Sequence, residues 1–426
     1  MPSSRGFWQA LGPGVLFAAA AVGVSHLVQS TRAGATFGLG LVFVVLLANL
    51  TKYPAFRFGP QYAAATGTSL LEGYRRLGRW ALVLYAVVTV ATMFTVQAAV
   101  TVVTAGLAIA LLGISVSPVV VSAVLLAACG VLLAVGHYQW LDRIVKVLVA
   151  VLTVFTVLAT ALTIPNLVAA APPLWIPASQ WDLATLAFVA ALAGWMPSAL
   201  DVAVWQSAWT LARARTSGHE PTVRESMIDF HVGYIGTVVL ALCFLTLGAG
   251  VMYGTGTEFA AGAGGFAAQV IELYAQTLGA WARPLIGAAA FAVMFSTTLT
   301  VLDGFPRALA MLVARWHGPE TPGHDELGTP IGQRRYLGFI AVIAVGAVVV
   351  LQVLLTSLKT FVDIATVLSF LTAPVLAWMN HRVMTTDDAI AEADRPKPWL
   401  RALSAACVVA LGAFAIGFIV LRVVTG

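Results

Sequence analysis

Long apolar stretches alternate with short polar connections along the whole chain. A helix that crosses the hydrocarbon core of a bilayer needs about 20 mainly apolar residues, and the sequence holds eleven such stretches. They centre on residues 13–30, 38–58, 81–111, 116–136, 141–164, 183–211, 227–253, 284–313, 335–356, 360–381 and 400–424. The pattern predicts an all-α polytopic membrane protein with 11 transmembrane helices. The first stretch is expected to be a retained span, because ten more apolar stretches follow it.

The composition agrees with a lipid environment and excludes other classes of protein. Of the 426 residues, 60% are hydrophobic and only 10% are charged, whereas a soluble domain carries about 25% charged residues. So few charges do not cover a water-facing surface, which excludes a soluble enzyme and a disordered protein. The three cysteines lie singly in apolar stretches and are interpreted as core residues; they are Cys129, Cys243 and Cys407.

The positions of lysine and arginine predict the orientation of the chain. Cytoplasmic loops hold these residues in excess. With the N-terminus in the cytoplasm, 19 of the 23 basic residues, Lys52 among them, fall at inner helix ends or loops. The four outside are Arg32, Arg283, Lys359 and Arg422. We therefore expect a cytoplasmic N-terminus, an external C-terminus and a location in the plasma membrane. The net charge of +5 serves orientation, so no nucleic-acid partner is expected.

The sequence lacks the motifs of ATP-driven pumps and of enzymes. None of the four lysines follows Gly or Asp, so no phosphate loop or phosphorylation site is present. There is no His-Glu-x-x-His or Gly-x-Ser-x-Gly motif, and the longest polar connections, 317–333 and 385–398, are short. The stretch 264–279 reads as an amphipathic helix on the outer surface. We predict no enzyme and no cofactor, which leaves a channel or a gradient-driven carrier.

Two apolar stretches contain interruptions at corresponding places. The first holds Val22-Gly23-Val24-Ser25-His26, and the sixth holds Ala193-Gly194-Trp195-Met196-Pro197-Ser198 followed by Asp201. Pro197 lacks a backbone N–H, so a break there is physically motivated, although a simple kink is the alternative. Breaks five spans apart are typical of a five-plus-five inverted repeat around a substrate site. We expect one domain over 1–426, with repeats at about 11–168 and 182–382 and an extra helix at 400–424.

Several short motifs resemble one transporter family. Gly12-Pro13-Gly14 opens the first span, Ala33-Gly34-Ala35 closes it, Leu46-Leu47-Ala48-Asn49 lies in the second, and Ala193-x-x-Met196-Pro197 lies in the sixth. These motifs resemble the natural resistance-associated macrophage protein (NRAMP) family of divalent metal transporters. The resemblance implies an inverted-repeat carrier with broken helices 1 and 6, plus an eleventh helix, that imports metal ions such as manganese or iron, with protons as a possible coupling ion.

The resemblance also implies a set of site residues, and part of the family pattern is replaced here. The family's Asp-Pro-Gly-Asn motif falls on Gly23, Val24, Ser25 and His26, so the metal-binding carboxylate is absent. The family's carbonyl and methionine ligands match Ala193 and Met196. A histidine implicated in proton movement is Ser198 here, the helix-3 acidic residues give way to Thr95 and Gln97, and a glutamine ligand in helix 10 falls on Thr366.

The remaining polar residues have alternative interpretations. His26 and Met196 offer donors that suit softer transition metals, whereas Mg²⁺ and Ca²⁺ favour carboxylates. His26 is also a candidate proton carrier, and a core role is the alternative for both residues. Asp201, one turn beyond Ser198, either joins a proton path or pairs with a basic residue. For Asp303 and Asp363 we favour structural pairing.

Two functions follow from these residues. The first is an NRAMP-like carrier, a symporter where protons are coupled, that moves divalent metal ions by alternating access, with Gly23, His26, Ala193, Met196 and Thr366 at the site. His26, Gln97, Ser198 and Asp201 would then serve proton coupling. The alternative is a same-fold carrier for a small organic solute, in which Gly23 and Ser25 open space. Beyond such a substrate and protons, membrane lipid is the expected partner.

Overall fold

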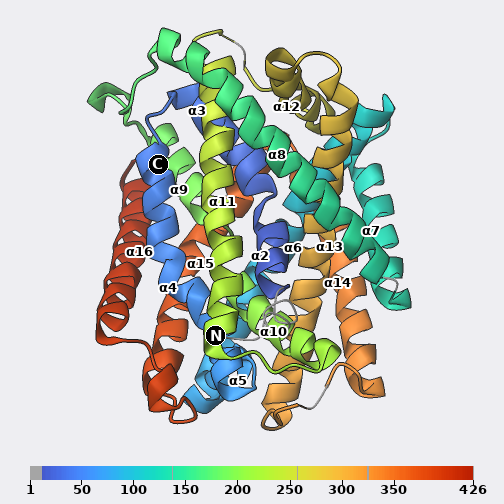
Figure 1. Ribbon diagram of the computed structural model, residues 1–426, viewed down its shortest axis with the longest axis vertical. Helices are drawn as coiled ribbons and strands as arrows, with labels where there is room; N and C mark the ends of the chain where they lie inside the picture. The colour runs from blue at the N-terminus through green and yellow to red at the C-terminus, as the bar shows by residue number, and fades with distance from the viewer. Residues whose placement is uncertain (1–11, 137, 257, 324–325, 426) are drawn as a thin grey trace.

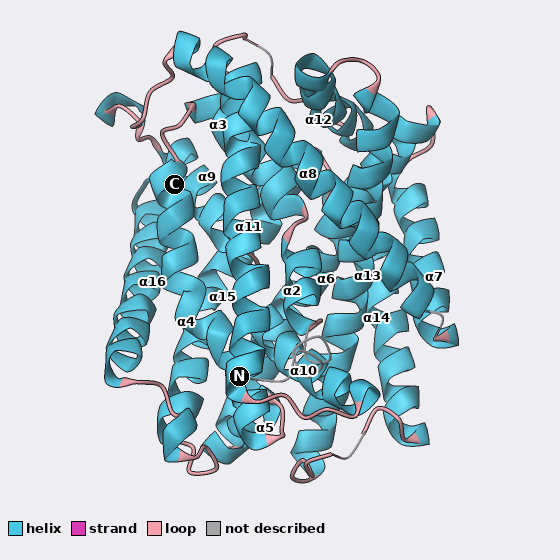
Figure 2. Cartoon of the chain, viewed as in Figure 1, coloured by secondary structure: helices cyan, strands magenta, loops and turns pink. Residues whose placement is uncertain are grey.

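Long helices that run roughly along one axis make up the molecule (Figures 1 and 2). The structure, a computed structural model, describes residues 12–136, 138–256, 258–323 and 326–425, and no strand occurs among them. The first half contains α2 (Pro13–Ala21), η1 (Ser25–Ser30), α3 (Thr31–Phe37), α4 (Val42–Thr66), α5 (Leu70–Leu77), α6 (Arg79–Leu112), α7 (Pro118–Val135) and α8 (Tyr138–Ala170). The second half contains α9 (Leu183–Gly194), α10 (Val202–Ser217), α11 (Val223–Val251), α12 (Ala263–Leu278), α13 (Ala282–His317), α14 (Pro330–Leu354), α15 (Leu358–Thr386) and α16 (Pro398–Thr425). Short 3₁₀ turns lie at η2 (Ala178–Gln180) and η3 (Glu392–Asp394).

The helices coincide with the apolar stretches of the sequence. In the described part of the chain, eight helices are long and apolar enough to cross a membrane. The α2 helix and the helical segment Ser25–Phe37 meet at an angle of 46° and together form a ninth span. The short apolar helix α9 and its successor α10 occupy the sixth predicted stretch. The protein is an all-helical integral membrane protein whose first and sixth spans are broken, as the sequence predicts.

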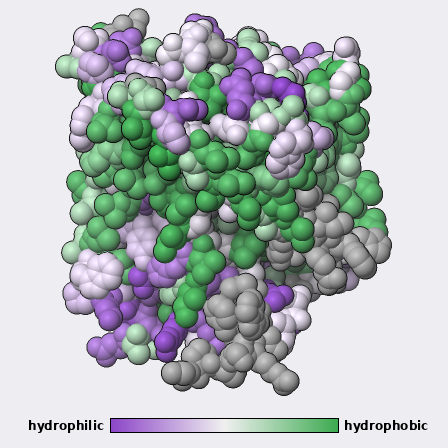
Figure 3. Space-filling view, turned by 45° about the horizontal axis from the view of Figure 1, so that its top comes forward, coloured by the Kyte–Doolittle hydropathy of each residue, from purple (hydrophilic) through white to green (hydrophobic). Residues whose placement is uncertain are grey.

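Burial separates central from peripheral helices. The most apolar windows of α6 and α13 are 72% and 78% buried, whereas those of α7, α14 and α16 are only 22% buried. On the face that Figure 3 shows, apolar side chains form a band across the middle, and hydrophilic side chains lie toward both ends. The peripheral helices therefore present their apolar faces to lipid, while α6 and α13 form walls of the interior.

Two short helices show the inverted relation between the halves. The α5 helix follows α4 at one end of the bundle, and α12 follows α11 at the opposite end (Figure 1). Each is thus placed after the second span of its own half. The buried residues of α12 recur at helical spacing, which confirms the amphipathic helix predicted for 264–279; they include Phe266, Val270, Leu273 and Tyr274.

Candidate functional site

The two helix breaks face each other inside the bundle. The α2 helix ends at Ala21, and a π-helical turn, η1, begins at Ser25. The α9 helix ends at Gly194, and α10 begins at Val202. The Ser25 hydroxyl lies 3.2 Å from the Pro197 carbonyl oxygen, which joins the two breaks directly. Gly194 packs against the backbone carbonyl of Thr366 in α15, so closely that a β-carbon at this position would collide with it.

A cavity lies between the breaks and the walls formed by α6 and α13. The cavity is narrow and open on one side, and its interior leaves about 20 Å³ free for groups the size of a water molecule. Two tryptophans and several small or branched apolar residues line it; they are Trp195, Trp205, Ala20, Ala21, Ala199, Val24, Val96, Val100, Val202 and Val301. The polar lining consists of the hydroxyl residues Ser25, Ser198 and Thr297. No charged residue is among the described residues that line this cavity.

The α13 helix packs tightly against the break in the first span. A β-carbon built on Gly23 would lie 2.9 Å from the Thr297 methyl carbon and 3.1 Å from its hydroxyl oxygen. The Thr297 hydroxyl is held in place because it donates to the Ala19 carbonyl of α2 at 2.8 Å. Gly23, the position at which the family resemblance implies an aspartate, therefore leaves no room for a larger side chain without movement of Thr297.

His26 is hydrogen-bonded at both ring nitrogens. Nδ1 lies 2.7 Å from the Ser25 hydroxyl oxygen, and Nε2 lies 2.9 Å from the Thr237 carbonyl oxygen of α11. A neutral ring meets both partners when Nε2–H donates to the carbonyl and Nδ1 accepts from Ser25. The single hydroxyl hydrogen of Ser25 is then not donated to the nearby carbonyls of Ala21 and Pro197. The side chain is fully buried and does not line the cavity. The predicted metal and proton roles of His26 stay predictions.

Met196 and Ala193 lie at the break of the sixth span but outside the cavity lining. The Met196 side chain is fully buried and belongs to an apolar cluster with Val189 and Phe370. The Ala193 carbonyl oxygen accepts a hydrogen bond from the ammonium of Lys52 at 2.7 Å. The structure thus gives each of these two residues an internal partner, and their predicted role as metal ligands stays a prediction.

Lys52 is the functional candidate that sequence reasoning missed. Its side chain is fully buried near the middle of α4, and its Nζ donates to the carbonyls of Ala193, Gly194 and Ser198 at 2.7, 2.6 and 3.3 Å. The sequence-based count of orienting charges at inner helix ends was wrong to include Lys52. The available signal was a lysine inside an apolar stretch, where a charge is costly and usually has a specific partner.

Asp201 lies at the start of α10 and is almost completely buried. Its Oδ1 has no hydrogen-bond partner among the described residues, and the same holds for the hydroxyls of Tyr85 and Thr89 and for the Trp205 indole nitrogen. Tyr85 and Thr89 both lie on α6, within electrostatic or hydrogen-bonding range of the Asp201 carboxylate. A buried cluster of polar groups that lie close to one another therefore adjoins the cavity at Trp205.

Gln97 and Thr366 lie beside the breaks on different elements. Gln97 of α6 donates to the Thr101 hydroxyl at 3.1 Å and to the Thr298 carbonyl at 3.3 Å, while its Oε1 lacks a partner among the described residues. The Thr366 hydroxyl of α15 accepts from Gln29 at 3.3 Å. Neither residue lines the cavity, so the structure does not bring them together with His26, Met196 and Ser198 into one set of donors.

Ion pairs hold the helices together toward both ends of the bundle. On the α12 side, Arg32 of α3 forms a bidentate pair with Asp363 of α15 at 2.7 and 3.0 Å. Toward the α5 end, Asp303 pairs with Arg307 at 2.7 Å and also accepts from Trp209 and Tyr336. The structural pairing predicted for Asp303 and Asp363 is confirmed.

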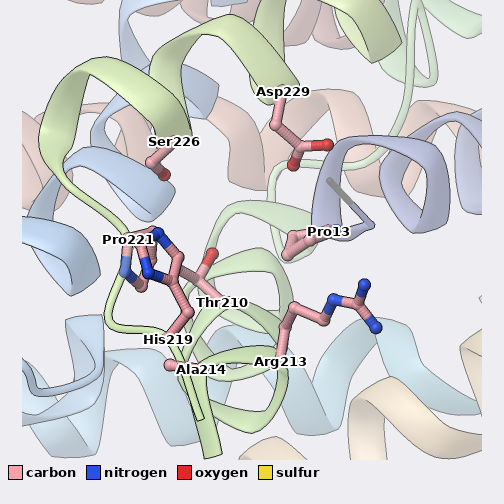
Figure 4. Close-up of a pocket in the computed structure, with 8 residues that line it drawn as sticks. All are labelled: Pro13, Thr210, Arg213, Ala214, His219, Pro221, Ser226 and Asp229. Carbon is pink, nitrogen blue, oxygen red and sulfur yellow. The ribbon is translucent and has the colours of Figure 1, made fainter. Parts of the chain in front are cut away.

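A second, smaller cavity lies at the start of α2. Figure 4 shows the Asp229 carboxylate beside Pro13 on this cavity, with Arg213 and His219 on the opposite side. Asp229 of α11 accepts from the backbone amide of Gly12 at 3.0 Å and from that of Gly14 at 2.5 Å. It thereby caps the N-terminus of α2, where a negative charge is stabilising. This cavity therefore lies at a junction between helices and is separate from the breaks.

The polar atoms around the breaks come mainly from hydroxyls and the backbone. Among the described residues, no group of three or more His, Cys, Asp or Glu side chains is placed to hold a metal ion. The polar atoms that do converge on the breaks are hydroxyls, backbone carbonyls and one ammonium.

Comparisons with known proteins place the chain among transporters. The family model described as natural resistance-associated macrophage protein-like matches residues 14–421. An uncharacterized protein of Pasteurella multocida is 36% identical over 378 residues, which cover 87% of this chain and 84% of that protein.

Among solved structures, a manganese transporter of Eremococcus coleocola superposes with a TM-score of 0.70 at 15% identity, covering 97% of this chain and 87% of the other. MhsT in complex with L-phenylalanine gives a TM-score of 0.66 at 14% identity, covering 98% of both chains. At these identities the likeness of the structures shows the fold.

Proposed function

Since the chain belongs to the natural resistance-associated macrophage protein-like family of secondary transporters, we propose that its broken helices enclose the binding site of a small organic solute. The observation that carries this proposal is the cavity between the breaks, whose described lining is uncharged and combines two tryptophans with three hydroxyl residues. Sites for small molecules are typically apolar and aromatic with a few placed polar groups.

The same cavity suits a divalent metal ion poorly. A bare divalent cation needs anionic or soft donors to replace its water, and Gly23 supplies none where the family resemblance implies a carboxylate. The Met196 side chain is packed among apolar neighbours, and the Ala193 carbonyl already accepts from Lys52. Metal transport, the other function expected from the sequence, is therefore the competing outcome of the experiment below.

A proton gradient is the energy source that we propose for accumulation of the solute. Asp201 carries this part of the proposal because its carboxylate is buried, partly unpartnered and next to the cavity residue Trp205. An ionisable group inside the membrane is costly, so a proton that binds and leaves with the conformation offers a direct coupling device. We propose that the α5 end faces the cytoplasm, in the plasma membrane, which agrees with the arginines at 75 and 76 of α5.

Thermal unfolding of the purified protein, screened against solutes and metals, tests the substrate class. The solute arm contains amino acids, carboxylates and nucleobases, and the metal arm contains Mn²⁺, Fe²⁺ and Cd²⁺. The proposal expects stabilisation by an organic solute, followed by exchange of that solute in proteoliposomes. Stabilisation and uptake of a metal ion, with no response to any solute, would make the metal function correct and this proposal wrong.

A further inference from the structure

We propose that the backbone carbonyls at the end of α9 form a cation site that the chain fills with its own Lys52 ammonium. In this arrangement the side chain replaces a free ion, so the carrier needs no dissolved cation at this place. The inference deepens the proposed function, on which it rests, because a resident cation explains why the substrate is a solute rather than a metal ion.

The geometry matches a primary ammonium group. An ammonium has three N–H donors and no acceptor, and Nζ of Lys52 lies 2.7, 2.6 and 3.3 Å from three carbonyl oxygens. All three acceptors belong to the break of the sixth span, at Ala193, Gly194 and Ser198. The donors of the charged form are therefore fully used, although the side chain has no exposed surface.

The electrostatics favour a cation at this position. The last turn of a helix exposes carbonyls and carries a partial negative charge, and Ala193 and Gly194 are the last two residues of α9. No carboxylate in the described part of the chain forms an ion pair with Lys52. The carbonyls of the broken helix thus provide the stabilisation that a buried charge requires.

Occupation by Lys52 excludes a second cation. A free ion that used the Ala193 and Gly194 carbonyls would have to approach the ammonium to within a few ångströms, and both charges would then compete for the same oxygens. A metal ion at the Ala193 carbonyl requires Lys52 to leave. Lys52 is in this sense a specificity-determining residue. Its long side chain reaches from α4 to the break and places a fixed charge where broken helices otherwise bind free ions.

Truncation of the side chain tests the inference without any substrate. Lys52→Ala removes the ammonium and most of the side chain, which leaves the three carbonyl oxygens (the carbonyl cradle) open to a small ammonium ion. We expect the unfolding midpoint of purified Lys52→Ala protein to rise by several degrees in methylammonium chloride, compared with choline chloride of equal concentration, because ligands of the native state stabilise it. The wild-type midpoint is expected to be the same in both salts.

Two control variants separate occupation of the cradle from general salt effects. Lys52→Met fills the space of the stem but brings no donor, so it is expected to show no preference for methylammonium. Lys359→Ala removes an exposed lysine at the start of α15 and is also expected to show none. If Lys52→Ala responds no more than these proteins do, the carbonyls do not form a cation site and the inference is wrong.

A measurement on the wild type decides the matter if Lys52→Ala does not fold. Solute exchange by wild-type proteoliposomes, in choline buffer with chelator, is expected to match exchange in buffer with Na⁺, K⁺ or Mn²⁺. A strict requirement for any of these ions would overturn the inference. The unfolding experiment contains no solute, so its result does not depend on the proposed function. Failure of the proposed function would be seen in a different experiment, as metal uptake without solute binding.

Discussion

Gly23 of the first broken span packs closely against Thr297 of α13, since a β-carbon on the glycine would lie 2.9 Å from the threonine methyl carbon. Thr297 also bonds the Ala19 carbonyl, so this threonine does not turn away without the loss of a buried hydrogen bond. The contact links the shape of the break to the packing of the opposite wall of the cavity.

The first prediction is that Gly23→Ala destabilises the protein through this contact alone. Overpacking in a well-packed interior costs about 1–3 kcal/mol. We expect Thr297→Ser, which removes the methyl group and keeps the hydroxyl, to recover most of that loss in the double variant. Gly236→Ala is the control, because no atom lies within 4 Å of a β-carbon there. If Gly23→Ala and Thr297→Ser have additive effects on thermal unfolding, the contact between these two residues does not cause the loss of stability.

The second prediction concerns the pair of Arg32 and Asp363. Arg32 is almost fully buried, donates to both carboxylate oxygens and lies 4.9 Å from the centre of the Phe188 ring. Asp363→Asn leaves this charge without its counter-ion, and hydrogen bonds to charged groups contribute about 1.5–3 kcal/mol. We expect a loss of that size in the free energy of unfolding.

The exposed pair of Arg283 and Glu272 is the control for this measurement. Their side chains are 50% and 41% exposed, and exposed pairs contribute about 0–1 kcal/mol. Glu272→Gln is therefore expected to change the unfolding midpoint little. Equal losses for Asp363→Asn and Glu272→Gln would mean that the partly buried pair of Arg32 and Asp363 does not hold α3 to α15.

Apolar periodicity and proline chemistry predict the fold far better than the site. The long apolar helices and both breaks follow from residues that are neighbours in sequence, such as Pro197 within its stretch. The pairing of Asp363 is likewise expected because a membrane charge needs a partner. The partners of Lys52 are different, since they depend on how α4 packs against α9, more than 140 residues away. A pattern of neighbouring residues in the sequence does not predict a contact between such distant segments.

The third prediction assigns the coupling role to Asp201. Asp201→Asn keeps the shape of the side chain but removes its ability to lose a proton. We expect exchange of solute across proteoliposomes to persist, whereas accumulation driven by a pH gradient is abolished. Asp182→Asn, which changes an exposed cap at the start of α9, is expected to retain both activities. Gradient-driven accumulation by Asp201→Asn would refute the coupling role.

The fourth prediction tests the cavity as the solute site. Ala199 lines the space between the breaks, and Ala199→Leu places a branched side chain in it. We expect solute binding to weaken by about tenfold or more, a change of about 1.4 kcal/mol. The unfolding midpoint without solute is also expected to fall, because the added atoms crowd a narrow cavity. Ala406→Leu on the exposed face of α16 is the matched control and is expected to bind as the wild type does. Unchanged solute affinity in Ala199→Leu, measured by calorimetry, would place the solute elsewhere in the molecule.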